Sequence, residues 1–160
     1  MEYEEALAYL HTRPRRPGRQ ASLERMRRLM ERLGNPQRGL KTVHIAGTNG
    51  KGSTLKMLEG MLLPGGWRVG SFLSPYLVDF RERIQLCGRM IEPRALAGVV
   101  EKTAAAAAGM EESPGEFEAL TAAALLFFAQ SGCDLVLLEA GLGGGHDATN
   151  VIDPPLLAVF

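Results

Sequence analysis

The sequence predicts an α/β fold in which helices cover a parallel β-sheet, and three observations support this prediction. Apolar runs typical of buried strands alternate along the chain with longer segments of helical periodicity. A glycine-rich loop separates one such strand from the helix that follows it. The run DLVLLEAG (134–141) is apolar without alternation, which is typical of a central parallel strand covered on both faces. A chain of 160 residues with 46% apolar content can bury one good core.

Local signals mark the first elements. SLERMRRLMERLG (22–34) is apolar at helical spacing, with Ser22 as the expected N-cap and Gly34 as the stop. KTVHIAG (41–47) contains β-branched residues and indicates a buried strand that leads into the glycine-rich loop. STLKMLEGMLL (53–63) then returns to a helical pattern, so this part of the chain is predicted as strand, loop and helix.

The rest of the chain continues the alternation. WRVGSFL (67–73) follows a PGG turn and indicates a second strand, after which we expect a polar loop over 74–91. Pro93 suits a helix start, and the segments 94–108 and 117–132 both predict helices. The last residues, PPLLAVF, indicate the beginning of another strand, so we expect the chain to be part of a larger one.

Composition and charge exclude several classes of protein. No apolar run reaches the roughly 18 residues needed to span a bilayer, and the charged start lacks a signal-peptide pattern, so we expect a cytoplasmic protein without membrane contact. Nine arginines lie between Arg13 and Arg38. We interpret them as a solvated helix face and expect no nucleic-acid partner, because no aromatic residues lie among them to stack on bases. Cys87 and Cys133 lack metal-site spacing and predict buried free thiols.

The loop GTNGKGST (47–54) predicts a phosphate-binding site. A glycine-rich turn between strand and helix offers an anion both backbone N–H groups and a helix N-terminus. Lys51 is placed to reach the outer phosphates, and a hydroxyl of Ser53 or Thr54 is placed to face a magnesium ion. The strict pattern GxxxxGK[ST] is not met, because Gly52 separates Lys51 from Ser53. A plain glycine turn with a surface lysine is the alternative, but the strand-loop-helix setting favours a nucleotide site.

A second candidate is Glu139, which ends the predicted central strand just before the glycine-rich run GLGGGHDATN. A carboxylate at the end of a strand beside the phosphate loop is in place to hold magnesium directly or through water. The alternative is a strand-end glutamate satisfied by backbone N–H groups. Next to the glycine loop, the magnesium interpretation is favoured.

Several other polar residues indicate structure more than chemistry. His44 lies within a predicted strand, which favours a hydrogen-bonded core histidine over a catalytic one. The segment 82–84 (ERI) indicates a solvated loop with one apolar anchor. His146 and Asp147, taken alone, are more typical of a turn than of a catalytic pair.

Together these segments resemble one family, the folylpolyglutamate synthases, which are often also dihydrofolate synthases, within the Mur ligase superfamily. The matching segments are SLERM, GNPQ, HIAGTNGKGS, SPYL, RERI, FEALTAAALLFF and LEAGLGGGHDATNVID. They follow the family's order and spacing and cover nearly the whole chain. The loop GTNGKGS, combined with GLGG and DATN, separates this family from the cell-wall Mur ligases.

The resemblance implies an ATP-dependent ligase that adds L-glutamate to folate through an acyl phosphate, with dihydropteroate as a second acceptor. It implies ATP and Mg²⁺ as cofactors and a monomer at full length. The implied fold is a P-loop nucleotide-binding domain of the Mur ligase type, of which residues 1–160 form the N-terminal part. The C-terminal glutamate-ligase domain lies outside the chain, and we therefore expect the isolated 160 residues to be inactive as a ligase.

The resemblance also implies a role for individual positions. Lys51 and Glu139 correspond to catalytic residues. The ATP-binding positions are Gly47, Thr48, Asn49, Gly50, Lys51, Gly52, Ser53 and Thr54. The magnesium ligands are Ser53, Ser74 and Glu139. The positions that line the pteroate or folate pocket are Ala21, Ser22, Leu23, Gly115, Glu116, Phe117, Glu118, His146, Asp147 and Ala148.

The sequence departs from the family pattern at four positions. The family usually has histidine at Tyr76, glycine at Ser22, and arginine-leucine at Gly145 and His146. The loss of that arginine affects substrate affinity or the order of the loop and leaves the phosphate-binding residues intact. Two alternatives remain open at this point, a Mur-type ligase with another carboxylate substrate and a nucleotide-binding module without catalysis.

Overall fold

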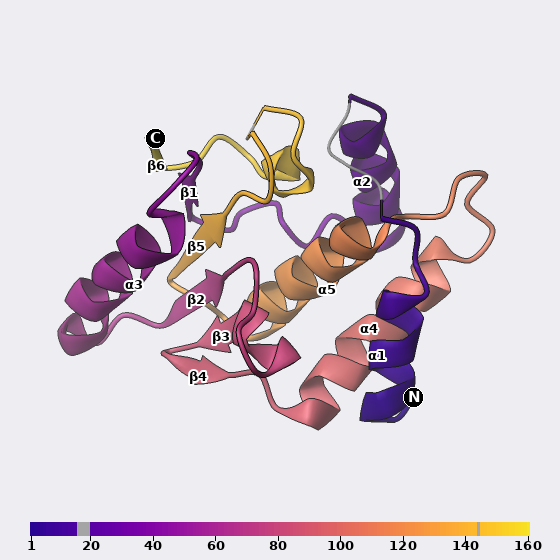
Figure 1. Ribbon diagram of the computed structural model, residues 1–160, viewed down its shortest axis with the longest axis horizontal. Helices are drawn as coiled ribbons and strands as arrows, with labels where there is room; N and C mark the ends of the chain where they lie inside the picture. Colours follow the sequence, from indigo (N-terminus) through magenta and orange to yellow (C-terminus); the bar gives the residue numbers. More distant parts are fainter. Residues whose placement is uncertain (16–19, 144) are drawn as a thin grey trace.

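The computed structural model has an α/β fold built on one six-stranded sheet, with strand order β4-β3-β2-β5-β1-β6. It describes residues 1–15, 20–143 and 145–160, and for Gln20 and Ala21 the backbone alone. The strands β2, β5, β1 and β6 run parallel, which confirms the predicted parallel sheet over its larger part. Helix α3 covers one face of the sheet, and α1, α2, α4 and α5 lie on the other (Figure 1).

The helices and strands alternate along the chain as the sequence predicts. The α-helices are α1 (Tyr3–His11), α2 (Gln20–Arg32), α3 (Lys51–Leu62), α4 (Pro93–Ala107) and α5 (Glu116–Gln130). The strands are β1 (Thr42–Ile45), β2 (Val69–Phe72), β3 (Ile84–Leu86), β4 (Arg89–Met90), β5 (Leu135–Glu139) and β6 (Leu157–Val159). Three 3-10 turns complete the set, at Leu63–Gly65, Phe80–Arg83 and Ala148–Val151.

The expected polar loop over 74–91 is wrong in its second half. This segment contains a 3-10 turn followed by β3 and β4, which extend the sheet in the antiparallel sense beside β2. Cys87 and Gly88 join the two strands with φ angles of +50° and +76°, the backbone geometry that closes a two-residue hairpin. Strands of three and two residues are too short to produce a periodic sequence signal, so the sheet is mixed where a purely parallel one was expected.

Helix α2 begins earlier than predicted. It starts at Gln20, so Ser22 lies inside the helix and its hydroxyl donates to the Glu118 carboxylate; the predicted N-cap role is wrong. A buried carboxylate competes for that hydroxyl, and the helix gains a tertiary contact in place of a cap. Gly34 has a φ of +81° just beyond the helix end, as its predicted role as a stop requires.

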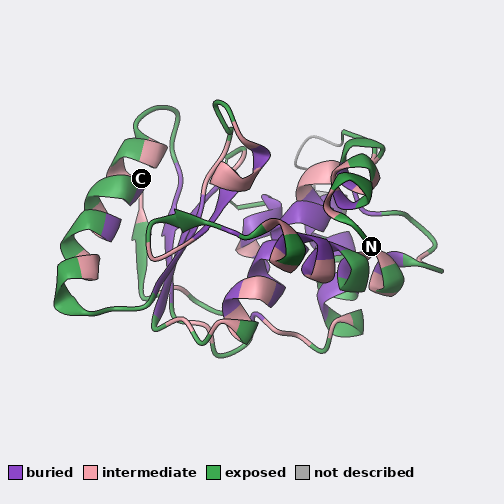
Figure 2. Cartoon of the chain, turned by 90° about the horizontal axis from the view of Figure 1, so that it is seen from below, coloured by how far each residue is buried: buried purple, intermediate pink, exposed green. Residues whose placement is uncertain are grey.

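The core lies mainly between the sheet and α5. All five residues of β5 are buried, and buried residues gather on the strands and on the helices opposite α3 (Figure 2). At one point the backbone of the sheet approaches α5 closely. A Cβ on Gly70 of β2 would lie 2.5 Å from Cδ1 of Phe128, so this position has no room for any side chain.

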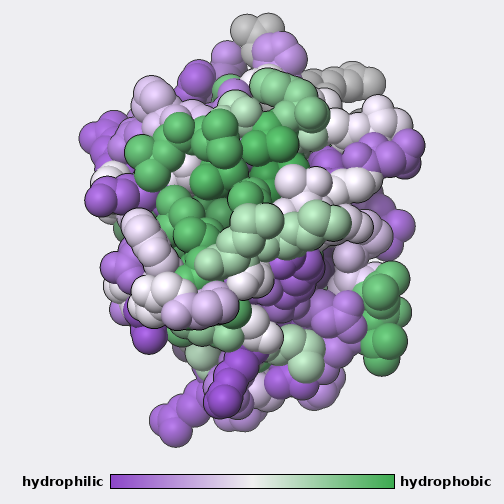
Figure 3. Space-filling view, turned by 90° about the vertical axis from the view of Figure 1, so that its left-hand side faces the viewer, coloured by the Kyte–Doolittle hydropathy of each residue, from purple (hydrophilic) through white to green (hydrophobic). Residues whose placement is uncertain are grey.

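The α3 face is covered by a single helix (Figure 1) and has an apolar surface patch (Figure 3). Apolar side chains gather on the side of the molecule that holds α3 and β6 (Figure 3), where Met57, Met61 and Leu157 are exposed. Cys87 and Cys133 are free thiols, as expected, but they are half-buried where full burial was predicted. Within the described ranges, no helix is long and apolar enough to cross a membrane.

Candidate active site

The predicted phosphate loop connects the buried strand β1 to the first residue of α3. Gly47 and Gly50 have φ angles of +134° and +78°, backbone conformations that residues with a side chain rarely adopt. Gly50 is the N-cap of α3, and no side chain caps the helix. The first N–H groups of the helix are therefore left for another acceptor, which is the arrangement that binds phosphate at helix N-termini.

Lys51 places its charge over this loop. Its Nζ atom donates to the carbonyl oxygen of Gly47 at 3.0 Å, so the side chain folds back across the turn. The residue is only half-buried, which leaves the ammonium group within reach of a ligand. A mobile cation beside free backbone donors suits a polyanion such as a nucleotide phosphate.

Glu139 ends β5, the strand next to β1, and faces the loop as predicted. Its carboxylate is 5% exposed, and Oε2 accepts a hydrogen bond from the Ser74 backbone N–H at 3.1 Å. The same oxygen lies 3.6 Å from the place that a Cβ on Gly52 would take, so the carboxylate lies directly beside the start of α3. The alternative of a glutamate satisfied by backbone N–H groups holds only in part, because Glu139 has one backbone donor and keeps further acceptor capacity; its magnesium role stays a prediction.

The charge state of Glu139 is set by opposing effects. Burial raises the pKa of this carboxyl above its ordinary value. The Ser74 N–H donor, followed by the Lys51 charge, acts in the opposite direction and lowers the pKa. A divalent cation or another positive group at this point would favour the ionised carboxylate further.

These residues border a cavity of about 630 Å³, a volume in the range of small-molecule sites. Its lining consists of Thr48, Asn49, Gly50, Lys51, Gly52, Ser53, Lys56, Leu73, Ser74, Pro75, Leu77, Glu82, Gln85 and Glu139. We call it the nucleotide cavity. The structure thus brings together most of the predicted loop residues with Ser74 and Glu139, while Gly47 and Thr54 do not line it.

The donor set of the nucleotide cavity fits magnesium better than a softer metal. No group of three or more His, Cys, Asp or Glu residues that could hold a metal occurs in the part of the chain that the structure describes. The lining offers oxygen groups, among them the carboxylate of Glu139 and the hydroxyls of Ser53 and Ser74, whereas the second carboxylate, Glu82, already accepts three backbone N–H groups. Mg²⁺ characteristically takes one or two protein oxygens and completes its shell with water and phosphate.

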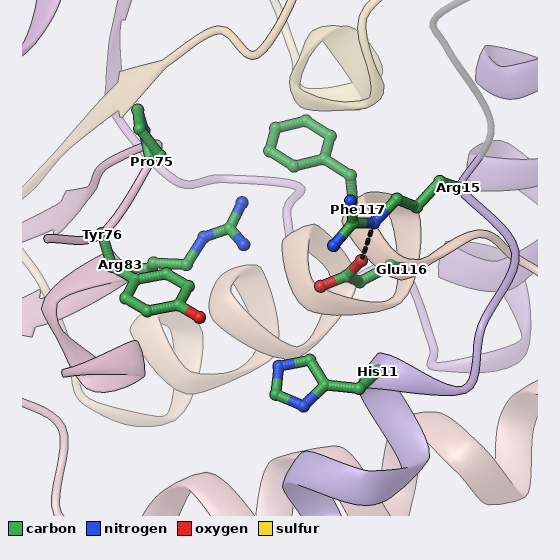
Figure 4. Close-up of a pocket in the computed structure, with 7 residues that line it drawn as sticks. All are labelled: His11, Arg15, Pro75, Tyr76, Arg83, Glu116 and Phe117. Atoms are coloured by element: carbon green, nitrogen blue, oxygen red, sulfur yellow. Dashed lines mark ion pairs between the residues drawn. The ribbon is translucent and has the colours of Figure 1, made fainter. Parts of the chain in front are cut away.

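A second cavity, of about 460 Å³, adjoins the first, since Pro75 lines both. We call it the aromatic cavity. Its other lining residues are His11, Arg15, Tyr76, Arg83, Glu116 and Phe117 (Figure 4). It contains two of the predicted acceptor residues, Glu116 and Phe117, and the departure at Tyr76 lies on its wall.

The acceptor residues predicted at 21–23 and 115–118 have mainly internal contacts. Glu118 is 2% exposed, and its carboxylate accepts from the Ser22 hydroxyl, from Arg25 at 2.9 and 3.1 Å, and from the Gly115 N–H at 2.9 Å. Leu23 is buried, and the side chain of Ala21 lies outside the described residues. Glu118 has no acceptor capacity left for a ligand, so it holds α2 against the start of α5.

Of the predicted acceptor residues at 146–148, two are buried and one is exposed. Asp147 is 3% exposed and accepts from the backbone N–H groups of Gly141, Leu142 and Thr149, and from the Thr149 hydroxyl. Ala148 is buried, whereas His146 is exposed. The Asp147 carboxylate therefore shapes the loop after β5, and only His146 presents its side chain to the surface.

His44 is a hydrogen-bonded core histidine, as predicted. Its Nε2 atom lies 2.7 Å from the Thr149 hydroxyl, which joins β1 to the loop held by Asp147. Burial lowers the pKa of the His44 imidazole, while the charge of Asp147 acts in the opposite direction. The neutral ring is thus favoured in the folded protein.

Sequence reasoning missed Arg83. The segment 82–84 was expected to be solvated with one apolar anchor; Ile84 is that anchor at 1% exposure, but Arg83 is also buried, at 9%. Burial lowers the pKa of its guanidinium. Glu82 is engaged as well, because its carboxylate accepts three backbone N–H groups of the preceding loop. Nothing in RERI distinguishes Arg83 from Arg81, which pairs with Asp79.

The arginines between Arg13 and Arg38 are not all solvated. Arg27 and Arg28 are exposed, as expected, but Arg25 is 7% exposed and forms ion pairs with Glu118 and Glu112. The prediction of a solvated face is therefore wrong at Arg25. The arginines at 16 and 19 lie outside the described residues.

Comparison with known proteins identifies close relatives, although no protein-family model matches the chain. A dihydrofolate synthase/folylpolyglutamate synthase of Bacillus subtilis is 39% identical over 165 aligned positions, which cover 98% of this chain and 37% of the relative. The crystal structure of a Thermotoga maritima folylpolyglutamate synthase matches 95% of this chain and 36% of its own, with 44% identity and a TM-score of 0.87. An FPGS–AMPPCP–folate complex matches 99% of this chain and 39% of its own, with 36% identity and a TM-score of 0.90. The chain thus spans well under half the length of these relatives.

Proposed function

The chain corresponds over nearly all its length to the N-terminal portion of the folylpolyglutamate and dihydrofolate synthase family, and from this premise we propose that it supplies the ATP-binding part of a folate–glutamate ligase. The observation that carries the proposal is the meeting of the phosphate loop with Glu139 at the carboxyl ends of β1 and β5. Similar chains occur in complexes with AMPPCP and with folate, which supports both ligands here.

The proposed reaction has two displacement steps. An oxygen of the acceptor carboxylate attacks the γ-phosphorus of ATP, the bond to the bridging oxygen breaks, and ADP leaves with the electron pair. The amine of L-glutamate then attacks the acyl carbon, phosphate leaves, and the nitrogen loses a proton to give the amide. Activation is required because an ionised carboxylate is a poor electrophile, whereas an acyl phosphate carries a good leaving group.

The residues of the nucleotide cavity divide the first step between them. The backbone N–H groups at the start of α3 hold phosphate oxygens, and Lys51 neutralises the charge that builds up on the transferring phosphoryl group. Glu139, with the hydroxyls of Ser53 and Ser74, would hold Mg²⁺. Magnesium held by these residues would supply positive charge that offsets the negative charge of the phosphates.

The acceptor would enter by the aromatic cavity, which adjoins the nucleotide cavity at Pro75. Phe117 and Tyr76 offer ring surfaces for a planar pteroate or folate group. We place folate there as acceptor, with dihydropteroate as a second one. The residues that bind L-glutamate, which the family's C-terminal domain supplies, lie outside these 160 positions.

The test uses the intact protein, meaning these 160 residues together with the C-terminal glutamate-ligase domain that the resemblance implies, and two measurements. Isothermal titration with AMPPCP should show binding that strengthens when Mg²⁺ is added, and phosphate release from ATP should require both folate and L-glutamate. Binding of AMPPCP without any folate-dependent or glutamate-dependent phosphate release would overturn the ligase assignment and leave a nucleotide-binding module. Absence of AMPPCP binding would overturn the phosphate-loop assignment itself.

A further inference from the structure

Arg83 lies at the junction of the two cavities. It lines the aromatic cavity, and its Nη2 atom lies 3.4 Å from the hydroxyl oxygen of Ser74, which lines the nucleotide cavity. Figure 4 shows the guanidinium extending into the cavity between the rings of Tyr76 and Phe117. The centre of the guanidinium is 5.8 Å from the centroid of the Phe117 ring. A charged group thus occupies the passage between the expected acceptor and the expected nucleotide.

The hydrogen-bonding capacity of Arg83 is almost unused. A guanidinium has five N–H donors, but among the described residues Arg83 makes one hydrogen bond, the long contact to Ser74. Its buried Nε atom has no partner in the described part of the protein. Among the described residues no ion pair of Arg83 with a carboxylate is found: Glu116, on the same cavity, pairs with Arg15 at 3.4 Å, and the charges of Glu116 and Glu139 act on Arg83 without direct pairing.

A second buried arginine shows what a structural role requires. Arg25 is as buried as Arg83, at 7% against 9% exposure. Arg25 donates to Glu118 through Nε and Nη2, at 3.1 and 2.9 Å, and to Glu112 through Nη1 at 2.8 Å. Burying a cation without such partners is unfavourable, and an anion that pairs with Arg83 would offset this cost.

We propose that Arg83 binds the carboxylate of the acceptor and holds it at the edge of the nucleotide cavity. This inference rests on the proposed function and adds the residue that recognises the reacting group. The planar fork of a guanidinium matches a carboxylate in two parallel hydrogen bonds. Because Arg83 adjoins Ser74, whose N–H binds Glu139, a carboxylate on Arg83 lies beside the expected γ-phosphate.

The aromatic walls favour a carboxylate attached to an aryl group, directly in pteroate or through the glutamate in folate, over a free inorganic anion. Phe117 and Tyr76 can cover the flat faces of an aryl group while Arg83 pairs with the carboxylate at its end. A phosphate oxygen of the nucleotide is the other negatively charged group with which Arg83 could pair. The experiment therefore measures the two ligands separately.

The test compares two acceptors that differ in one group. Pteroate and its primary carboxamide are titrated into the intact protein and into Arg83→Gln, with AMPPCP as the nucleotide probe. We expect Arg83→Gln to weaken pteroate binding by about 10- to 100-fold, the loss typical of a charge-assisted pair, and to change carboxamide binding by less than about threefold. AMPPCP affinity should stay the same. Arg83→Lys keeps the charge and should recover part of the preference for pteroate.

The control is Arg81→Gln, which makes the same substitution two positions away on the same 3-10 turn. Arg81 pairs with Asp79 and does not line the aromatic cavity, so pteroate affinity should not change. Equal weakening of pteroate and carboxamide in Arg83→Gln would assign Arg83 a structural role and overturn the proposal. Weaker AMPPCP binding with unchanged pteroate binding would assign Arg83 to the nucleotide and overturn it as well. If the unsubstituted protein binds AMPPCP but not pteroate, the acceptor assignment fails together with this proposal.

Discussion

Glu139 and Asp147 are two carboxylates of similar burial, at 5% and 3% exposure, with different surroundings. Asp147 accepts three backbone N–H groups and one hydroxyl, which use the acceptor positions of both its oxygens. Glu139 accepts one backbone N–H and faces a cavity. A carboxylate has about four lone-pair sites, so Asp147 is closed to a ligand and Glu139 is open. The number of contacts, more than the depth of burial, separates the closed carboxylate from the open one here.

Like Asp147, Glu118 is a buried carboxylate whose acceptor positions are all used. Its substitution has the largest expected effect on the protein. Glu118→Gln should lower the free energy of unfolding by about 3–5 kcal/mol, because it leaves the buried Arg25 without its main charge partner. Urea unfolding measures the change. Glu24→Gln, on the exposed side of α2, is the matched control and should change stability by less than about 0.5 kcal/mol. A loss below about 1 kcal/mol in Glu118→Gln would mean that the number of hydrogen bonds a buried carboxylate accepts does not indicate how much it stabilises the fold.

Lys51 lines the same cavity as the open carboxylate of Glu139, and its substitution tests the proposed role of that cavity. Lys51→Ala should reduce the rate of phosphate release by about 10²- to 10³-fold, since a charge aimed at the transition state is lost. Stability should change little, because the only hydrogen bond of its Nζ atom to a described residue is the one to the Gly47 carbonyl. Lys102→Ala, an exposed lysine on α4, provides the control for loss of a positive charge. Unchanged turnover in Lys51→Ala would remove the phosphate-loop assignment.

Glu139 and Asp147 can be compared directly. Glu139→Gln should keep the unfolding free energy within about 1 kcal/mol of the original, yet raise the Mg²⁺ concentration needed for half-maximal phosphate release by about tenfold or more. Asp147→Asn should do the reverse, with a loss of about 1–3 kcal/mol and no change in Mg²⁺ requirement. If Glu139→Gln and Asp147→Asn required the same Mg²⁺ concentration for half-maximal phosphate release, the distinction between an open and a closed carboxylate would be wrong.

The smallest expected effect is a pH dependence through His44. Its pKa is lowered in the folded state, so the unfolded chain takes up the proton first as the pH falls. The stabilisation from the neutral ring is therefore fully present above the unfolded value of about 6.5 and declines below it, by at most about 1.4 kcal/mol per pH unit. His44→Gln should lessen the loss of stability between pH 7.5 and 5.5, whereas His146→Gln, at an exposed position, should not. Identical pH profiles for His44→Gln and the original protein would rule out this origin.

The sequence predicts the part of the site whose residues are neighbours along the chain. The phosphate loop, its strand and its helix carry local signals of glycine content and periodicity, so α3 begins within two residues of its predicted start. The end of β5 at Glu139 is equally visible, because an uninterrupted apolar run stops there.

The contacts that join distant segments could not be predicted in this way. Ser22 and Glu118 are 96 positions apart, and the helix-capping preference of serine gave no sign of that bond. Arg81 and Arg83 share the same local sequence, but one pairs with Asp79 at the surface and the other is buried beside Phe117. Only the tertiary position of the 3-10 turn, which places Arg83 beside Phe117 of α5, decides which arginine enters the cavity.

The close approach of Gly70 to Phe128 has a consequence for how the chain can vary. A methyl group at position 70 would overlap the Phe128 ring, so a substitution there requires a smaller residue at 128 at the same time. The two positions form a coupled pair, and related chains should change both or neither. Gly70→Ala alone should be deleterious, and Phe128→Leu introduced with it should restore the fold, a compensation that a double-mutant cycle would measure as a favourable coupling.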